Sequence, residues 1–494
     1  MSATPPQETP SPPAATPDAP SDAPKLHRAG SLTYTGKRLA ALFGALLTAD
    51  VVLTLIERVE AKILPVVLKS FEASDQQIAI VASSIPALLQ LLVAPVVSYR
   101  SDRKRTRRGR RIPYILWATP IMAIFLAATP FAPEIGAWLV GSERIASWME
   151  ALPWAPTMLT FAMLTIGFRF GHIVLVTMFF SLFRDVVPSS HMGRFLALFR
   201  AVGALSTFVT AYWLLGIAVS HAREIFVGLA TLNLLGFFGI CIFVKEGEYP
   251  PVEDDPATAK ESWGKGVFNV CRTFVRESYS HPIYRWTYLA RLPIFASVPI
   301  SGFIVFFPQR ELGMDLDAVG KMMAWPAIAW ILVAYPVGRW FDRFGTIRVM
   351  KPALVLITLA YALSFFGVVG EKTFFVSTFV TGILFWVVML GQLALAQEVF
   401  HRDRYAQLSS ASIIIHSIGI AFVFSPFAGW ALDAMRDLHL QVVVPFVGEV
   451  EIGRYRFVNL MLAGLFGMSF FSLLFVSRWW RRLGGGQNAY EAPL

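Results

Sequence analysis

The chain has 494 residues, of which 55% are hydrophobic and only 15% are charged, and its formal net charge is +10. Soluble proteins carry charges on about a quarter of their residues, and a chain this apolar could not cover its surface with polar groups. The composition therefore argues against a large soluble enzyme. Because the positive charge gathers in short loops between apolar runs, it indicates a membrane protein rather than a nucleic-acid-binding one.

The N-terminal segment has the composition of a disordered tail. Residues 1–24 are dominated by Pro, Ala, Ser, Thr and Asp, and such a segment cannot bury enough apolar surface to fold. It has no basic stretch followed by an apolar one, so it is not a secretory signal peptide. We expect residues 1–36 to form a disordered cytoplasmic tail.

Twelve apolar runs follow, each about long enough to cross a bilayer core of about 30 Å. The spans that we predict are 39–64, 76–98, 112–131, 157–182, 194–219, 224–244, 286–308, 319–341, 350–369, 373–397, 406–433 and 456–477. They form two groups of six, at 37–244 and 286–480. The sequence thus predicts an all-α membrane protein with twelve transmembrane helices in two six-helix bundles.

The connecting segments predict the orientation. Basic residues gather in the loops 99–111, 245–285 and 341–349 and at the end of the last span. Both termini are therefore expected on the cytoplasmic side of a bacterial inner membrane. The second part of the linker 245–285 looks like an amphipathic helix on the membrane surface, and residues 481–494 form a cytoplasmic tail. Residues 132–156 are rich in Trp and polar groups, which favours an interfacial helix on the outer face.

The two groups of spans echo each other. The segment "YRSDRKRTRRGRRIPYIL" after the second span aligns with "GRWFDRFGTIRVMKPALV" after the eighth, which pairs Asp102 with Asp342 and Arg103 with Arg343. Internal repeats of this kind are typical of secondary transporters.

This arrangement resembles the major facilitator superfamily over about residues 37–480. The family loop G-x-x-x-D-R-x-G-R-R is matched by Asp102, Arg103, Gly109, Arg110 and Arg111, and the second copy retains Gly338, Asp342, Arg343 and Gly345. The resemblance implies that Asp102 and Asp342 each cap a helix of the opposite half and, with Arg partners, lock one transport state. Asp185 and Arg194 are expected to join that network.

Two further stretches resemble one branch of this superfamily. "RRGRRIP" (107–113) and "DVVPSSHMGRFLALFR" (185–200) are similar to the glycoside–pentoside–hexuronide:cation symporters and sucrose transporters, which implies a sugar or glycoside substrate. Sodium-coupled members carry carboxylates on their second and fourth helices. The second span here has none in its interior, and the fourth carries Arg169 and His172, so we expect proton coupling.

The first span carries an acid near its middle. Asp50 lies about 18 Å from the inner end of that span, and Thr54 and Glu57 follow on the same helix face. A charged side chain at this depth costs about 2.5–3.5 kcal/mol, so it indicates function. Asp50, Thr54 and Glu57 therefore form a candidate stripe for the proton and for a hydroxyl-rich ligand.

A second interpretation applies to the outer part of this stripe. Glu57, Arg58, Glu60 and Lys62 have the spacing of solvated ion pairs at the outer interface. For Glu60 and Lys62 this interpretation is the favoured one, and for Glu57 both remain open.

The fourth span places Arg169 at mid-helix and His172 one turn further. Arg169 requires an anion nearby, and the resemblance places the first and fourth helices together, so Asp50 or Glu57 is the expected partner. Protonation of that acid would release Arg169, which is a coupling step. His172 is either part of this step or a packing residue.

The second half offers fewer candidates. Trp386 and Gln392 on the tenth span suit sugar recognition, since a flat ring packs under a pyranose and an amide bonds its hydroxyls, although Trp386 could also simply pack against neighbours. Arg291 is expected at the inner interface, and His416 is expected to be structural.

The sequence contains no nucleotide-binding loop, no hydrolase or metalloprotease motif and no Cys/His cluster. We therefore predict no enzyme activity, no cofactor and no metal. The predicted function is proton-coupled symport of a sugar or glycoside, with the solute, a proton and membrane lipid as partners, no nucleic acid, and a monomer as the unit. An exporter of amphipathic compounds and a bacteriochlorophyll-delivery factor for light-harvesting assembly remain as alternatives.

Overall fold

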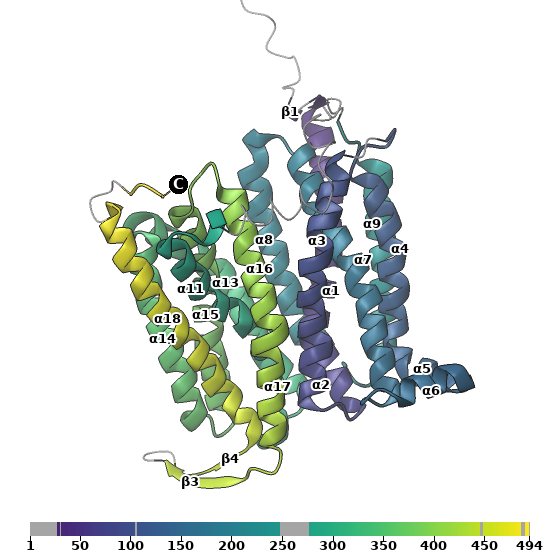
Figure 1. Ribbon diagram of the computed structural model, residues 1–494, viewed down its shortest axis with the longest axis vertical. Coiled ribbons are helices and arrows are strands. Elements are labelled where there is room, and N and C mark those ends of the chain that lie inside the picture. The colour runs from purple at the N-terminus through teal and green to yellow at the C-terminus, as the bar shows by residue number, and fades with distance from the viewer. Residues whose placement is uncertain are drawn as a thin grey trace, which may run out of the picture.

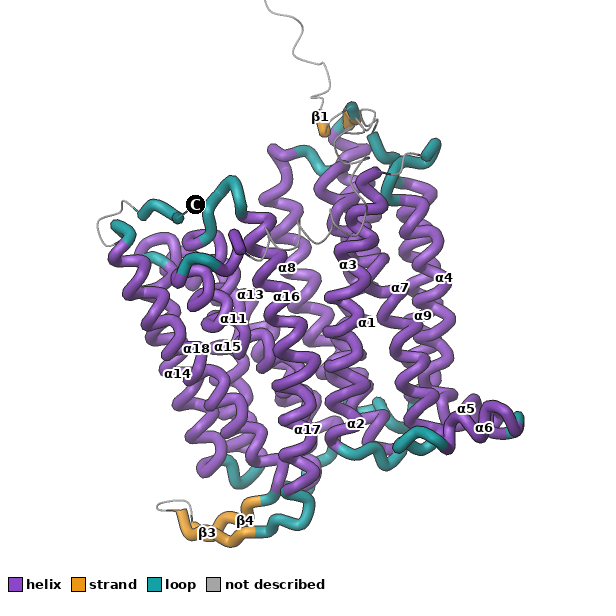
Figure 2. Tube along the Cα trace, in the orientation of Figure 1, coloured by secondary structure: helices purple, strands orange, loops and turns teal. Residues whose placement is uncertain are grey.

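The structure is a computed structural model that describes residues 27–29, 31–103, 106–247, 276–444, 448–485 and 490–493. These residues fold almost entirely into helices that stand side by side (Figures 1 and 2). Eleven helices in this part of the chain are long and apolar enough to cross a membrane, and Leu198–Leu214 forms a shorter apolar helix. The predicted all-α membrane fold is therefore confirmed, and the protein is an integral membrane protein.

The first bundle contains six membrane-crossing units. They are α1 (Gly36–Ser70); α2 (Asp75–Ala79) and α3 (Ile85–Arg103), joined by the π-helical turn Ile80–Ser84; α4 (Ile112–Ala128) with α5 (Ala132–Val140); α7 (Pro156–Val186); α8 (Met192–Val209), continued by the π-helical turn Thr210–Leu214; and α9 (Ala222–Phe243). The short helix α6 (Glu143–Glu150) lies beside α5, where the sequence predicted an interfacial helix. A hairpin of β1 (His27–Ala29) and β2 (Leu32–Tyr34) precedes the bundle.

The second bundle repeats this order. It contains α11 (Pro282–Ile300) and α12 (Phe306–Glu311), joined by the 3₁₀ turn Ser301–Val305; α13 (Leu316–Phe344); α14 (Thr346–Gly367); α15 (Glu371–Val399); α16 (Tyr405–Gly419) and α17 (Ser425–Ala434), joined by the π-helical turn Ile420–Phe424; and α18 (Phe457–Arg482). Strands β3 (Leu440–Val444) and β4 (Gly448–Ile452) form an antiparallel hairpin between α17 and α18.

The bundle has two faces, and both described ends of the chain lie on one of them (Figure 1). We call this the terminal face; it carries the segments 27–29, 31–35, 106–111, 187–191, 245–247, 276–281, 400–404, 483–485 and 490–493. The opposite, far face carries 71–74, 141–155, 215–221, 312–315, 368–370, 435–444 and 448–453. The predicted disordered tail and most of the predicted amphipathic linker helix lie outside the described residues.

Helices α4 and α7 pack unusually closely because one of them presents glycine. A Cβ atom added at Gly171 would lie 2.8 Å from the backbone nitrogen of Met122. Small residues allow such close contact between membrane helices, where dispersion and not water exclusion drives packing.

The C-terminal segment folds back onto the terminal face of the second bundle. The Tyr490 hydroxyl donates to the carbonyl oxygen of Val399 at 2.8 Å, and the Tyr284 hydroxyl donates to that of Pro493 at 2.5 Å. Burial raises the pKa of Tyr490 above its ordinary value. The last residues that we predicted as a tail are thus partly packed against the helices.

The N-terminus of α4 is capped by an acid that follows α9. The Glu246 carboxylate accepts hydrogen bonds from the backbone N–H groups of Arg110, Arg111 and Ile112 at 2.8, 2.7 and 2.6 Å. Gly109 precedes them at φ +99°, and a Cβ atom there would collide with the Glu246 carboxylate. The glycine of the repeated loop is therefore required by both its backbone conformation and this close contact.

Replacing Glu246 by Gln should lower the stability of the first bundle by about 1–2 kcal/mol, because a neutral amide with one acceptor oxygen replaces a carboxylate at a helix N-terminus. Thermal unfolding of the purified protein in detergent checks this. Glu224, an exposed acid in the first turn of α9, gives the matched control: Glu224→Gln should change the unfolding temperature far less. Equal effects of the two substitutions would contradict the assigned cap.

Candidate functional site

A central cavity of about 180 Å³ lies between the two bundles. The first half contributes Arg58, Ala61, Lys62, Thr207 and Leu215 to its wall. The second half contributes residues of α11 to α15 and α18, among them Ser301, Tyr361, Ser377, Thr378, Thr381, Trp386 and Asn459. The cavity is thus shared by both halves and has a hydroxyl-rich and aromatic wall opposite a basic one.

The two predicted ligand contacts of the second half fall in different places. Trp386 lines the cavity, and its ring stacks near that of Trp330 with centroids 6.0 Å apart. Gln392 does not line it. Its side-chain oxygen accepts hydrogen bonds from Nε and Nη2 of Arg291 at 3.1 and 3.0 Å. The structure therefore brings Trp386, but not Gln392, to the cavity.

Arg291 is buried, with 7% of its surface exposed, so the expectation that it lies at the interface is wrong. Besides Gln392 it donates to the Ser412 hydroxyl at 2.7 Å. His416, one turn after Ser412, stacks on the Phe295 ring at 4.3 Å. Helix α11 therefore carries a buried cation that hydrogen-bonds to neutral acceptors. The sequence analysis missed this group because Arg291 lies near the end of a predicted span.

Four charged residues in the middle of α1 point to two different sides. Glu57 lies 3.5 Å from Nε2 of His172, and Glu60 forms an ion pair with Arg169, both on α7. Arg58 and Lys62 line the cavity instead. Because successive residues turn by about 100° along a helix, one face of α1 presents acids to α7 while the next presents bases to the cavity.

The interpretation of Glu60 and Lys62 as solvated interfacial residues is therefore wrong. Glu60 is only 3% exposed. The physical reason is the length of α1, which continues through Pro65 to Ser70 and places these residues well inside the bundle.

The expected partner of Arg169 was also wrong: it is Glu60, not Asp50 or Glu57. Helices α1 and α7 are antiparallel: α1 ends at the far face, and α7 begins there. At 1.5 Å per residue, Arg169 lies about 20 Å from the far end of α7, and on α1 Asp50 lies about 30 Å, Glu57 about 20 Å and Glu60 about 15 Å from the far end. Depth therefore excludes Asp50, and the rotation of α1 turns Glu60 toward Arg169 and Glu57 toward His172.

Breaking the Glu60–Arg169 pair from one side should cost about 3–5 kcal/mol, because it leaves one buried charge uncompensated. We expect Glu60→Gln and Arg169→Gln each to lower the unfolding temperature strongly. The double variant should recover most of the loss. Urea or thermal unfolding of the three variants measures the coupling, and additive losses would contradict it. Glu134→Gln, which opens the exposed pair with Arg223, serves as the control and should cost less than about 1 kcal/mol.

Asp50 lies deeper along α1 and has no cationic partner within ion-pair distance in the described part of the chain. It is 1% exposed, and its Oδ2 atom has no hydrogen-bond partner there. The Thr54 hydroxyl donates to the Asp50 carbonyl oxygen at 2.7 Å and lies 3.4 Å from Oδ1. Asp50 and Thr54 are thus adjacent as predicted, but Asp50 does not line the cavity.

The repeated loop of the first half forms a polar network on the terminal face. Asp185 accepts a hydrogen bond from Arg110 at 2.9 Å and lies 3.6 Å from Nε of Arg111, and Arg111 also donates to the Ser101 hydroxyl. Asp185 therefore ties the ends of α3, α4 and α7 together. Arg103 is exposed, and the side chains of Asp102 and Arg194 lie outside the described part, so their predicted roles remain predictions.

The second copy of the loop does not behave as the resemblance implied. Asp342 is exposed on the last turn of α13 and makes no hydrogen bond or ion pair with any described residue, so its predicted capping role is wrong for this structure. Arg343 is exposed too and lies over the Phe344 ring. The nearby N-terminus of α14 is occupied by Glu398, which accepts from the Thr346 N–H at 3.1 Å.

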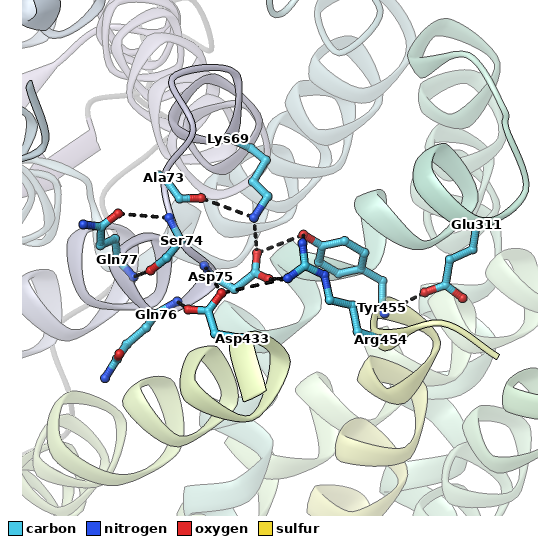
Figure 3. A network of polar contacts seen from close by, with 10 residues as sticks. All are labelled: Lys69, Ala73, Ser74, Asp75, Gln76, Gln77, Glu311, Asp433, Arg454 and Tyr455. Atoms are coloured by element: carbon cyan, nitrogen blue, oxygen red, sulfur yellow. Dashed lines mark hydrogen bonds and ion pairs between the residues drawn. The ribbon is translucent and has the colours of Figure 1, made fainter. Parts of the chain in front are cut away.

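The far face carries a charged cluster that the sequence analysis did not identify (Figure 3). Asp75 is fully buried and lies 2.7 Å from Nζ of Lys69 and 3.0 Å from Nη1 of Arg454. It also accepts a hydrogen bond from the Tyr455 hydroxyl at 2.9 Å. In return, Asp433 accepts from the backbone N–H groups of Asp75 and Gln76 at 2.9 and 2.8 Å.

We call Lys69, Asp75, Asp433, Arg454 and Tyr455 the far-face latch, because it joins the two halves. Helix α2 begins with a capping box in which Ser74 and Gln77 bond each other's backbone N–H groups, and Asp433 adds a cap from the other half. The pattern "ASDQQ" signals the helix start, but nothing in it signals the partner more than 350 residues away.

Glycine permits this contact. A Cβ atom at Gly429 on α17 would lie 2.6 Å from Cα of Gln76, and one at Gly320 on α13 would collide with the Ala211 carbonyl. The halves are therefore packed backbone to backbone at both contacts, the first of them next to the latch.

Comparison with known proteins agrees with this architecture. The sequence profile of the Major Facilitator Superfamily matches residues 61–424. The chain belongs to the major facilitator superfamily. Major facilitator proteins are transporters, so the superfamily assigns this protein to the transporters of small-molecule solutes rather than to the enzymes.

Individual relatives are distant. A general alpha-glucoside permease of Schizosaccharomyces pombe is 26% identical over 182 residues, which is 35% of this chain and 32% of the permease. The matched stretch is thus about a third of each protein.

Solved structures of this superfamily type show the same fold. The nucleoside transporter NupG superposes with a TM-score of 0.59 at 12% identity, covering 88% of this chain and 99% of NupG. A bacterial homologue of the human lysosomal transporter Spinster, inward-facing and unoccupied, gives 0.58 at 13% identity over 90% and 96%. A bacterial homologue of the iron transporter ferroportin, outward-facing, gives 0.57 at 14% identity over 88% and 99%.

Proposed function

We propose that this major facilitator protein is a proton-coupled symporter for a sugar or glycoside. The observation that carries the proposal is the cavity between the halves, with hydroxyls and Trp386 on one wall and, behind the other, the charged pairs of α1 and α7. Sites at the interface of the two repeats are typical of secondary transporters. The partial similarity to a yeast alpha-glucoside permease supports a glycoside as the solute.

The proton-carrying groups that we propose lie on α1. An ionised carboxylate is costly to bury without a partner, and Asp50 has one oxygen unbonded within the described residues. Asp50 therefore accepts and releases the coupled proton. Protonation of Glu60 or Glu57 would weaken its contact with Arg169 or His172 and link proton binding to movement of α7 against α1.

The conformational cycle that we propose rocks the bundle 37–244 against the bundle 286–480 around the cavity. The far-face latch holds the halves together on one side, while Asp102, Arg103, Gly109, Arg110, Arg111, Asp185 and Arg194 act on the terminal face. Since the basic loops lie on the terminal face, we place this face on the cytoplasmic side of a bacterial inner membrane.

Uptake into proteoliposomes tests the function. Purified protein should accumulate a radiolabelled glycoside, such as maltose or methyl α-glucoside, when the exterior is acidified, and should not respond to an equal sodium gradient. A proton ionophore should abolish accumulation. Accumulation driven by sodium, efflux of amphipathic dyes without sugar uptake, or co-purified pigment without any flux would each contradict the proposal; the last two match an exporter and a pigment-delivery factor.

A further inference from the structure

We infer that the central cavity selects a solute that carries a negative charge, a carboxylate or phosphate on a hydroxylated ring. This rests on the proposed function only in taking the cavity as the place where the solute binds. The observation behind it is a pair of cations on the cavity wall that form no ion pair with an acid in the described part of the chain.

Arg58 and Lys62 lie one turn apart on α1, and both line the cavity. No carboxylate of a described residue lies within ion-pair distance of either group, and Nε of Arg58 is buried without an acceptor. Two neighbouring cations in the wall of an internal cavity repel each other and lose part of their hydration. An anion bound between them would offset both costs and supply the missing acceptor, as Arg does for carboxylates and phosphates elsewhere.

The acids on the same stretch of α1 are already engaged. Glu57 faces His172 and Glu60 pairs with Arg169, both on the side of α7. In the second half the cavity wall contributes hydroxyls, an amide and aromatic rings but no acid. The cavity therefore has a fixed basic side that a neutral sugar would leave uncompensated.

The remaining residues of the cavity wall indicate which groups the uncharged part of the solute carries. The Arg58 guanidinium lies over the Trp386 ring, 6.0 Å from its centroid, so an anionic substituent bound at Arg58 would bring the ring of the solute beside Trp386. Ser377, Thr378 and Thr381 present hydroxyls along the same helix.

Binding to the purified protein tests the inference with three probes of one shape. Methyl glucoside is neutral, methyl glucuronide carries a carboxylate, and glucose 6-phosphate carries a phosphate. We expect calorimetry at low salt to show at least one of the two anions binding about tenfold or more tighter than methyl glucoside. This preference should shrink as salt is added, because screening weakens the attraction.

The double variant Arg58→Gln/Lys62→Gln should lose the preference while still binding methyl glucoside, which also shows that it is folded. Arg58→Lys should retain part of it. Arg348→Gln, an exposed basic residue at the start of α14, is the control and should keep it fully. Equal binding of the three probes by the wild type, or a preference that survives in the double variant, overturns the inference.

The two proposals fail separately. Proton-driven uptake of a neutral glycoside without any preference for the anions leaves the symporter proposal standing and removes the anion site. Tight binding of methyl glucuronide or glucose 6-phosphate that depends on Arg58 and Lys62, with no proton-driven flux of any glycoside, supports the anion site and removes the symporter.

Discussion

Replacing Asp50 by Asn should abolish proton-driven accumulation while leaving exchange of solute across the membrane intact. Asn keeps the shape and the contact with Thr54 but cannot take up or release a proton. The loss in accumulation should be complete within the resolution of the assay, because a transporter without its coupled ion only equilibrates its solute. Paired measurements of gradient-driven uptake and of counterflow in proteoliposomes separate the two processes.

The control for this variant is Asp437→Asn, which removes an exposed acid on the far face. It should leave both uptake and counterflow at wild-type rates. Unchanged accumulation in Asp50→Asn would show that another acid carries the proton, with Glu57 and Glu60 as the next candidates. Loss of counterflow together with uptake would mean that Asp50 is needed for folding or for movement rather than for coupling.

The membrane fold was predictable because it follows from lengths of apolar sequence. A span of about 20 apolar residues has few alternatives to a helix in a bilayer, and the repeated basic loops reveal two halves. The helix ends were less predictable, since a polar turn still continues a helix that its neighbours cover. The first helix was predicted to end at 64, but it continues to Ser70. Because of this error, Glu60 was predicted at the solvated interface, whereas it is buried beside Arg169.

The pairing across helices depends on depth, which requires accurate helix ends, and on helix rotation. With α1 and α7 counted from their far ends, depth excludes Asp50 as the partner of Arg169 but leaves both Glu57 and Glu60, and only the rotation of α1 decides between them. Asp50 was identified correctly as buried because it lies far from either end of α1, where an error of several residues changes nothing. The cavity position of Arg58 and Lys62 depends on the same rotation of α1, which the sequence does not fix.

The far-face latch could not be predicted from local pattern. Asp75 and Asp433 are 358 residues apart, and each taken alone reads as an acid at a helix end. Their pairing requires the two halves to meet with a particular register, and it depends on Gly429, whose missing side chain has no meaning until α2 is known to lie against it. The polar network of the terminal face was predictable because most of its residues belong to one loop with a recognisable motif.

Several helices that meet between the halves contain a π-helical turn. The π-helical turns at 80–84 and 420–424 lie between the two parts of the second and eleventh membrane-crossing units and contact each other, and a third lies at 210–214. Such turns leave backbone groups poorly bonded and occur at functional sites. We regard them as the places where these helices bend when the halves move, while the latch determines which side is closed.

Replacing Asp75 by Asn should therefore open the far face. The substitution removes the negative charge that holds Lys69 and Arg454 together, and leaving buried charges unpaired costs about 3–5 kcal/mol. Because that cost falls on the closed arrangement, a shift of about 4 kcal/mol changes the ratio of closed to open protein about a thousandfold. Gly429→Leu should act in the same direction for an independent reason, since a side chain there overlaps α2.

Spin labels at Ser70 and Asp437, in a background without native cysteines, report the separation across the far face. Both are exposed, and they follow Lys69 in the first half and Asp433 in the second along the chain. A population at longer distance should dominate in Asp75→Asn and in Gly429→Leu but not in the wild type. Asp315→Asn, which changes only the cap of α13 on the same face, should leave the distances unchanged. If both latch variants keep the wild-type distance distribution, the two halves are held together elsewhere, and the charged cluster serves the stability of the fold rather than the choice between its states.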